Sequence, residues 1–335
     1  MVLPVKVLFV IPGEAQGSSM IFARRQAESL AREGVEVDLF HLRSRTSPRE
    51  LARESARFRR RVRSFDPQVI HAHFGTVTAL FAAWAAPSRP LVITFRGSDL
   101  NGAQSLRGVA GQVFSQVAAL CADRIVCVSR QLRERLWWRR GSAVILPSGV
   151  DPELFCPEPR WQARQRLGWS YDERVVLFNA GHDPAVKRLD LAKEALALTQ
   201  GLLTGLRMEV LDGAIPPARV PDLMNAADCL LLTSDREGSP TVIQEALACN
   251  LPVISVDVGD TVERLRGVRH SAIVPRDASA IAIELARVLR TPTRSDGRNK
   301  VGEFSAPRIA GELCRIYREL AAERSEDSAW NTSPY

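Results

Sequence analysis

Two carboxylates stand in the segment Ser234–Glu245, and their surroundings indicate a ligand site. Glu237 and Glu245 follow the apolar run Cys229–Thr233, which predicts a buried strand that leads into a helix. A carboxylate can accept two hydrogen bonds from neighbouring hydroxyls, such as those of a ribose. The same side chains could instead only complement the positive end of the helix dipole, an effect worth roughly 0.3–1 kcal/mol each. Their spacing alone leaves both interpretations open.

The residues between the two carboxylates suit the approach of an anion to the backbone. Gly238 permits close contact or an unusual φ, and Pro240 suits the first turn of the following helix, where its missing N–H costs little. The N–H groups of Ser239 and Thr241 would then be available to an anion or a hydroxyl. We therefore expect this loop to bind a ligand.

Alternating apolar runs and amphipathic stretches predict how such a loop is positioned. The strand candidates are Val5–Ile11, Val35–His41, Val69–His73, Leu91–Phe95, Ile125–Val128, Arg174–Asn179, Met208–Leu211, Cys229–Thr233 and Val253–Asp257. Helical stretches separate most of them, which is typical of α/β proteins with doubly wound parallel sheets. In such sheets, ligands bind beyond the carboxyl ends of the strands.

The chain length and a proline-rich passage predict two domains. A chain of 335 residues exceeds one ordinary core, and Pro147–Pro159 should run as an extended connection. We expect one Rossmann-like domain over residues 1–157 and a second over residues 158–305. A terminal helix over residues 306–325, able to cross back to the first domain, and a frayed tail over residues 326–335 complete the expected organisation.

The charge distribution is uneven, and it bears on the choice of partner. The formal net charge is +7, with nine arginines from Arg43 to Arg63 and five from Arg130 to Arg140. Each cluster is either a solvated helix face or a surface for an anionic partner. A basic helix expected over Gln131–Arg140, with Trp137 and Trp138, favours peripheral docking on an anionic membrane. Nucleic acid is the weaker alternative because no known binding module is present.

Other patterns bear on the compartment and on the class of enzyme. Six cysteines lack the spacing of a metal site or a disulfide framework, which favours a reducing cytoplasm. The N-terminus predicts a strand and not a signal peptide. The apolar stretch Val77–Pro87 is about half of the ~20 residues that span a bilayer. The G-x-G-x-x-G fingerprint of an NAD enzyme is missing. We expect a cytoplasmic protein that associates at most peripherally with a membrane.

Several motifs together resemble one enzyme family. E-G-S-P-T-V-I-Q-E, from Glu237 to Glu245, is similar to the E-x7-E signature of the retaining glycosyltransferases of family 4, which have the GT-B fold. Further similarities occur at Val69–Thr76, Thr94–Asp99, Val128–Arg130, Pro147–Phe155 and Asn225–Asp228. The resemblance implies two Rossmann-like domains that face a cleft, and a nucleotide-diphosphate-sugar donor. It also implies retention at the anomeric carbon without a metal or other cofactor, and a glycan or lipid-linked acceptor in cell-wall or exopolysaccharide biosynthesis.

The resemblance also assigns roles on the donor side. It implies that Glu237 contacts the donor sugar, Glu245 the nucleotide ribose and Lys187 the donor diphosphate, with Arg188 as an adjacent candidate. Positive charge at Lys187 would stabilise the departing diphosphate. The further donor-side candidates are Gly17, Gly238, Ser239, Pro240 and Thr241.

His182 departs from the family pattern, which usually has an arginine at this position. A neutral imidazole carries no charge for the diphosphate. Either Arg188 substitutes, or diphosphate binding and catalysis are weaker, or His182 is structural. A catalytically weak nucleotide-sugar-binding protein of the same fold therefore remains the alternative function, and a sugar-nucleotide 2-epimerase of this fold is disfavoured by the transferase signature.

Four residues of the first domain are candidates at strand ends. His73 ends a strand and is either a catalytic group or a core histidine. Arg96, Ser98 and Asp99 follow the next strand and could serve the acceptor, although the family more often has histidine in place of Arg96.

Overall fold

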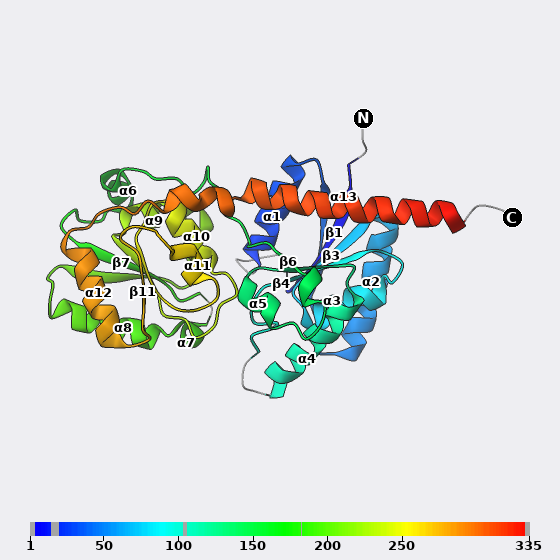
Figure 1. Ribbon diagram of the computed structural model, residues 1–335, viewed down its shortest axis with the longest axis horizontal. Helices are drawn as coiled ribbons and strands as arrows, with labels where there is room; N and C mark the ends of the chain where they lie inside the picture. The colour runs from blue at the N-terminus through cyan, green and yellow to red at the C-terminus, as the bar shows by residue number, and fades with distance from the viewer. Residues whose placement is uncertain (1–3, 15–19, 103–105, 182, 332–335) are drawn as a thin grey trace. The chain divides into compact units, whose positions relative to one another are not determined.

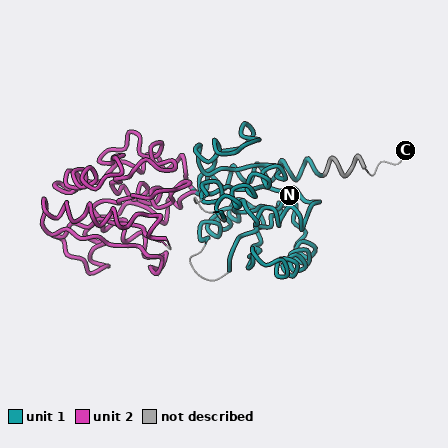
Figure 2. The backbone as a smooth tube through the Cα atoms, turned by 90° about the horizontal axis from the view of Figure 1, so that it is seen from below, with its two compact units in different colours: residues 1–148, 306–335 teal, residues 149–305 magenta. Residues whose placement is uncertain are grey.

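The computed structural model describes residues 4–14, 20–102, 106–181 and 183–331. The chain divides into two compact units (Figure 2). Unit 1 comprises Met1–Ser148 and Ala306–Tyr335, and unit 2 comprises Gly149–Ser305. Gly17 and His182, two of the expected donor-side residues, lie outside the described residues.

Unit 1 contains a six-stranded parallel sheet in the order β2-β1-β3-β4-β5-β6 (Figure 1). Its strands are β1 Lys6–Pro12, β2 Glu36–Leu42, β3 Val69–His73, β4 Leu91–Phe95, β5 Arg124–Cys127 and β6 Val144–Ile145. Its helices are α1 Ile21–Arg32, α2 Pro48–Phe65, α3 Thr76–Ala85, α4 Leu106–Cys121, α5 Arg130–Glu134, the 3-10 turn η1 Arg140–Ser142 and α13 Ala306–Asn331.

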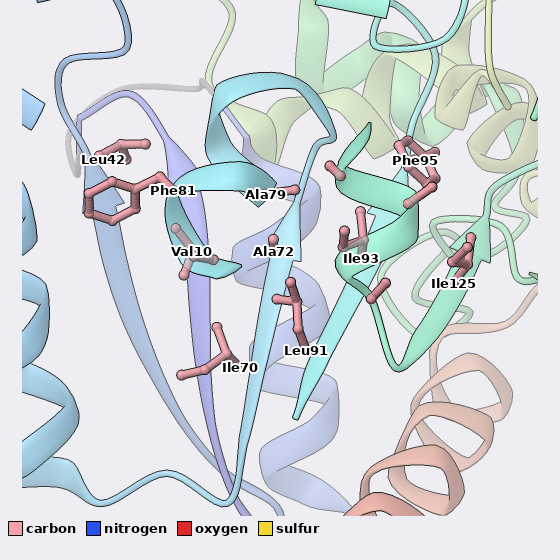
Figure 3. Packing of buried hydrophobic residues seen from close by; sticks show 14 of the residues in the cluster. Val10, Leu42, Ile70, Ala72, Ala79, Phe81, Leu91, Ile93, Phe95 and Ile125 are labelled. Atoms are coloured by element: carbon pink, nitrogen blue, oxygen red, sulfur yellow. The ribbon is translucent and has the colours of Figure 1, made fainter. Parts of the chain in front are cut away.

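Both faces of this sheet are buried, which explains its continuous apolar strands. Successive side chains of a strand point to opposite faces. Leu8 and Val10 accordingly join the core beneath α2, α3 and α4, whereas Val7 and Phe9 join a second core. Figure 3 shows the first core, in which Val10 lies among side chains of β3, β4 and α3.

The second core of unit 1 is closed by the first and last helices of the chain. Ile309, Leu313, Ile316, Tyr317 and Leu320 of α13 are all buried against β1 and α1. The C-terminal helix therefore completes the domain that the N-terminus begins, as Figure 1 shows. It continues to Asn331, beyond the end expected from the sequence.

Unit 2 contains a five-stranded parallel sheet in the order β11-β10-β9-β7-β8. Its strands are β7 Arg174–Asn179, β8 Leu206–Leu211, β9 Cys229–Leu232, β10 Val253–Val256 and β11 Ala272–Val274. Its helices are α6 Arg160–Leu167, α7 Pro184–Lys187, α8 Leu189–Gln200, α9 Val220–Ala226, α10 Thr241–Ala248, α11 Thr261–Leu265 and α12 Ala278–Arg290, with the 3-10 turns η2 Pro217–Arg219 and η3 Gly297–Glu303. The predicted pair of doubly wound parallel sheets is confirmed.

The boundary between the units lies near the start of the proline-rich passage and not near its end. Phe155, expected in the first domain, is fully buried in the core of unit 2. Val150 donates its N–H to the carbonyl of Phe304 at 3.0 Å, and Arg298 donates to the carbonyls of Pro152 and Phe155. These contacts attach residues 149–157 to unit 2, so unit 2 begins at Gly149 and not at residue 158.

The expected basic helix over Gln131–Arg140 is wrong. The helix α5 ends at Glu134, and Arg139 lies in a left-handed backbone conformation. Its guanidinium donates to the carbonyls of Ala119 and Ala122, at the end of α4. The arginines of this segment therefore satisfy backbone carbonyls as well as facing solvent.

A buried ion pair between Arg164 and Asp228 anchors the start of the first strand of the unit 2 sheet, β7. Arg164 of α6 is 1% exposed and donates to Asp228, to Ala226 O and to three further carbonyls. Asp228 also accepts the N–H of Val175 at 2.7 Å. The motif Asn225–Asp228 thus joins α6, α9 and the start of β7 (the Asn225 amide accepts from the N–H of Glu158). Its role in this structure is to hold the sheet and helices together.

Replacing Arg164 by methionine should lower the free energy of unfolding by about 3–5 kcal/mol, because Asp228 and several carbonyls would lose a buried partner. Arg166→Met is the matched control on the same helix, since Arg166 pairs with exposed carboxylates and should cost at most about 1 kcal/mol. Urea unfolding followed by circular dichroism measures both. Equal shifts of the two midpoints would contradict the structural role of this pair.

Candidate functional site

Lys187 and Glu237 meet at one edge of the unit 2 sheet. The strands β7 and β9 are parallel neighbours, so the loops that follow them leave the same edge. Lys187 ends α7, which follows β7, and Glu237 lies in the loop after β9. The Lys187 ammonium lies 2.5 Å from Oε1 of Glu237. The structure therefore brings together two of the three residues expected to carry the donor chemistry.

Local turn chemistry places Lys187 at this edge. The Asn179 side chain accepts the N–H of Gly181 at 3.1 Å and turns the chain at the end of β7. Asp183 then caps α7 by accepting the N–H of Val186, and Pro184 occupies the first turn. Arg188, in the left-handed conformation at φ 56°, ends this short helix immediately after Lys187.

Direct hydrogen bonds fix the loop of Glu237 against α7. The Thr233 hydroxyl lies 2.8 Å from the carbonyl oxygen of Lys187 and 3.0 Å from that of Arg188. The N–H of Asp235 donates to Val186 O at 2.9 Å. These hydrogen bonds join the two loops, so the ion pair is held by them as well as by its own attraction.

The ion pair is mostly withdrawn from solvent. The Lys187 and Glu237 side chains are 21% and 12% exposed. The Ser234 hydroxyl donates to the same oxygen of Glu237 at 2.8 Å. An ammonium has three N–H donors, so Lys187 can hold Glu237 and still donate to phosphate oxygens. In this partly dry environment its positive charge acts more strongly than it would in water.

Gly238 permits close contact with its backbone, and another part of the protein, the turn at Gly259, makes this contact. The Cβ that an alanine would add at Gly259 would lie 2.8 Å from the carbonyl oxygen of Gly238. Gly259 has the positive φ in this region, at 61°. The turn after β10 therefore packs directly beneath the Glu237 loop.

Asp260, which the motif analysis did not single out, supports the same loop. Its Oδ2 accepts the Ser239 hydroxyl at 2.7 Å and Nε of Arg264 at 2.9 Å, and Gln244 donates to the same hydroxyl at 3.0 Å. Burial raises the pKa of the Asp260 carboxyl, while Arg264 opposes that shift. The sequence signal was its place in the loop that follows the apolar strand β10. Ser239 is thus held by side chains beneath it.

The helix α10 spans Thr241–Ala248, and Pro240 lies directly before it instead of in its first turn. Pro240 occupies its N-cap position, and Thr241 is the first helical residue. The first N–H groups of an α-helix have no partner within the helix, so the start of α10 offers donors to a ligand. Glu245 is half-buried on the same helix.

In unit 1, His73 and Arg96 are joined by a hydrogen bond. A terminal nitrogen of Arg96 lies 2.7 Å from Nδ1 of His73, so Nδ1 accepts and Nε2 carries the ring proton. That Nε2 is buried without a partner among the described residues. Burial holds the pKa of His73 well below its ordinary value, with His71 and Arg96 acting in the same direction. His73 is therefore a neutral donor.

Arg96 is held from several sides. Its guanidinium donates to Ser148 at 3.0 Å and to Gln26 at 3.1 Å, and it lies 4.0 Å from the Phe22 ring centroid. Burial lowers its pKa to about 9, although nearby Asp99 and Tyr317 oppose the shift. It remains charged near neutral pH.

A buried network behind His73 was not expected from the sequence. His71 stacks on His73 at 4.2 Å, and its ring nitrogens lie 2.6 Å from the Tyr317 hydroxyl and 2.7 Å from the Thr94 hydroxyl. Tyr317 belongs to α13, so the C-terminal helix supports the candidate site at the end of β3.

Asp99 and Ser98 have different positions in the loop after β4. Asp99 is buried, and its carboxylate accepts the N–H groups of Gly75, Arg96 and Gly97 at 2.8–3.1 Å. Asp99 therefore shapes the loop from inside, although it was a candidate for the acceptor side. Ser98 is exposed and remains available to a ligand.

Metal ligands and membrane-spanning helices were the two other features to consider in the described residues. No group of three or more His, Cys, Asp or Glu side chains that could hold a metal ion occurs among the described residues. Within the same part of the chain, no helix combines the length and hydropathy needed to span a bilayer.

Family models match both units of the chain. The model described as Glycosyltransferase Family 4 matches residues 18–154. The model described as Glycosyl transferases group 1 matches residues 170–291, which include Lys187, Glu237 and Glu245.

Curated relatives are similar over most of the chain. A Bacillus subtilis protein named as a teichuronic acid biosynthesis glycosyltransferase, TuaC, is 30% identical over 67% of this chain and 62% of its own length. A D-inositol 3-phosphate glycosyltransferase of Catenulispora acidiphila is 30% identical over 76% of this chain and 72% of its own length. The chain thus spans less than two thirds of the first of these relatives.

Solved structures share the fold at low sequence identity. Sucrose-phosphate synthase from Thermosynechococcus elongatus has a TM-score of 0.78 at 18% identity, over 95% of this chain and 100% of that chain. Anabaena HepE in complex with UDP and glucose has a TM-score of 0.70 at 18% identity, over 94% of this chain and 100% of that chain. These likenesses confirm the GT-B fold expected from the sequence.

The packing of Gly259 beneath Gly238 can be tested by comparing two glycines with positive φ. Gly267→Ala should cost about 1 kcal/mol, because its φ is 74° and its added Cβ would meet nothing within 4 Å. Gly259→Ala should cost at least about 2 kcal/mol, since the new Cβ would also push against Gly238 O. Calorimetric unfolding measures both variants. An equal loss of stability would show that the contact does not constrain the loop.

Proposed function

The chain belongs to the glycosyltransferases of family 4, and we propose that it transfers a sugar from a nucleotide-diphosphate-sugar donor to a glycan or lipid-linked acceptor. The observation that carries this proposal is the partly buried pair of Lys187 and Glu237 beside the N-terminus of α10. The fold neighbour HepE binds UDP and glucose, which supports a nucleotide sugar as donor. The relative TuaC is named for teichuronic acid biosynthesis, which supports an acceptor in cell-wall or exopolysaccharide assembly.

In this proposal Lys187 and Glu237 divide the donor between them. The Lys187 ammonium binds the diphosphate, and the Glu237 carboxylate accepts hydrogen bonds from hydroxyls of the sugar. Their contact at 2.5 Å supports this division, because the sugar and the phosphate are adjacent in the donor. Negative charge grows on the diphosphate as the glycosidic bond breaks, and a fixed positive charge stabilises that transition state. Arg188 is largely engaged with Asp190 and Asp235, which makes it a weaker candidate.

In this proposal the helix α10 binds further phosphate oxygens and the ribose of the donor. The backbone N–H groups near Ser239 and Thr241 donate to phosphate oxygens at the positive end of the helix. Glu245, half-buried on the same helix, accepts hydrogen bonds from the two ribose hydroxyls. Gly238 lets the turn at Gly259 pack against the loop, and Pro240 occupies the N-cap position of the helix.

We propose that transfer retains the configuration at the anomeric carbon. The bond from that carbon to the phosphate oxygen breaks while the acceptor oxygen bonds to the carbon from the same face. The acceptor's proton passes to the departing phosphate oxygen, so no protein nucleophile is needed. Lys187 and the start of α10 supply the positive charge that a metal ion provides elsewhere.

Unit 1 is the proposed acceptor side. His73 offers an Nε2–H that has no partner among the described residues, and a sugar hydroxyl can accept it. Arg96 holds His73 in the required tautomer, and the exposed Ser98 offers a hydroxyl nearby in the same loop. We propose a cytoplasmic location because all six cysteines are free thiols, as a reducing compartment favours.

Removing either member of the ion pair should remove most of the turnover. Lys187→Met and Glu237→Gln should each lower kcat by about 100-fold or more, because the first loses charge on the departing diphosphate and the second loses its contact with the sugar. The measurement is nucleotide release from a panel of UDP-, GDP- and ADP-sugars with a glycan acceptor.

Matched controls for this experiment lie on exposed helices of the same unit. Lys193→Met on α8 and Glu284→Gln on α12 make the same chemical changes away from the site and should leave kcat unchanged. Wild-type turnover in Lys187→Met would refute the proposed role of the lysine. Donor binding by the unaltered chain without any transfer would favour the nucleotide-sugar-binding alternative.

Glu245 should act on the nucleotide and not on the sugar. Glu245→Gln should raise the Kd for the preferred nucleoside diphosphate by about tenfold, because a charged acceptor of the ribose hydroxyls is lost. Glu237→Gln should not weaken binding of this sugar-free ligand. Isothermal titration calorimetry distinguishes the two variants, and equal weakening by both would contradict the division of roles.

A further inference from the structure

The helix α4 of unit 1 presents its large apolar side chains to solvent. Val109, Val113, Val117 and Leu120 recur at helical spacing and are 38–55% exposed. The opposite face of the helix buries smaller or polar residues, which are Ser115, Gln116, Ala118 and Ala119. This orientation is the reverse of that in an ordinary surface helix of a soluble domain.

An apolar groove adjoins this face. Its volume is about 230 Å³, and it is lined by Leu51, Val77, Leu80, Phe81, Trp84 and Phe114 from α2, α3 and α4. Trp84 and Phe114 are themselves 58% and 43% exposed. The α4 face, defined as the four exposed residues above with Phe114 and Trp84, is therefore continuous with a groove that could admit an alkyl chain. A contiguous apolar surface of this kind marks an interaction site.

Two exposed tryptophans lie beside α4. Trp84 stands on α3, with the Arg59 guanidinium 5.2 Å from its ring centroid. Trp137 is 56% exposed, and its backbone N–H donates to Oε1 of Gln116 in α4 at 2.9 Å. Tryptophan is enriched where an apolar region meets a polar one, as at the edge of a bilayer.

The charges around the α4 face are positive. The helices α3 and α4 contain no acidic residue, and Arg107 is their only charged residue. The neighbouring segment from Arg43 to Arg63 has nine arginines against Glu50 and Glu54. Both glutamates are paired with arginines of their own helix. The apolar face is thus bordered by an excess of exposed cationic side chains.

We propose that the α4 face docks on an anionic lipid bilayer. Apolar side chains, flanking tryptophans and a cationic border match the acyl, interfacial and headgroup layers of such a membrane. A second copy of the chain fits less well, because it would bring two positively charged borders together. The inference concerns the surface of unit 1 and does not depend on the transfer chemistry proposed above.

The segment from Arg130 to Arg140 contributes less to this docking surface than its arginines suggest. Between Arg130 and Arg140 the chain forms only a short helix, and Arg139 and Arg140 donate to backbone carbonyls. Trp138 also donates to Gln116 O instead of lying free on the surface. The apolar contribution to docking therefore comes from α4.

Vesicle flotation of the full chain tests the proposal. Unaltered protein should float with vesicles of phosphatidylglycerol and phosphatidylcholine at low salt, and much less with phosphatidylcholine alone. The double variant Val113→Glu/Val117→Glu should lower the ratio of bound to free protein at least about tenfold, because it places two negative charges in the contact. Both positions are exposed, so the fold should tolerate the change, and circular dichroism checks this.

A matched control lies on unit 2. Leu198→Glu/Ile283→Glu also places two acids at exposed apolar positions of helices and should leave flotation unchanged. Failure of the unaltered chain to bind anionic vesicles, or equal binding by both double variants, would overturn the proposal. So would light scattering that shows a dimer which Val113→Glu/Val117→Glu dissociates while vesicle binding persists, since the face would then belong to a second copy.

Discussion

Parallel pairing of β7 with β9 is the constraint on which the site of unit 2 depends. Parallel neighbours end at the same edge of a sheet, so residues 50 positions apart, Lys187 and Glu237, are brought within 2.5 Å. The sheet alone does not fix side chains to that accuracy. Thr233 and Asp235 bind the two loops to each other, and the turn at Gly259 supports them from below. The ion pair is therefore the result of a rigid arrangement and not its cause.

The fold and the central residues of the site could be predicted because they follow from local patterns. Buried parallel strands give continuous apolar runs, and the loop after each strand is where ligand groups belong. Glu237 was found in this way, whereas Lys187 and the roles of both residues came from the family resemblance. The domain boundary was misplaced since prolines indicate an extended segment but not the domain on which it packs. Phe155 decides that question through burial, which no local pattern reveals.

The supporting residues could not be predicted because their partners are distant in sequence. His71 meets Tyr317, 246 positions away, and only the return of α13 to unit 1 brings them together. Asp260 acts on Ser239 across two neighbouring loops in a similar manner. In each case a buried polar group is satisfied by another buried group, as the cost of desolvation requires. Such pairs are a property of the assembled domain.

The arginines show why composition is a weak guide to surface chemistry. The sequence shows how many arginines the chain has, but burial and hydrogen bonding decide which of their charges a partner can contact. Arg164 is entirely internal, and Arg139 binds carbonyls of the neighbouring helix, whereas Arg59 lies over an exposed tryptophan. The sequence pattern of α4 does not distinguish an apolar face that turns outward from one that turns inward, as in most soluble domains. Its outward apolar face, together with the exposed arginines that border it, is the feature that points to a membrane.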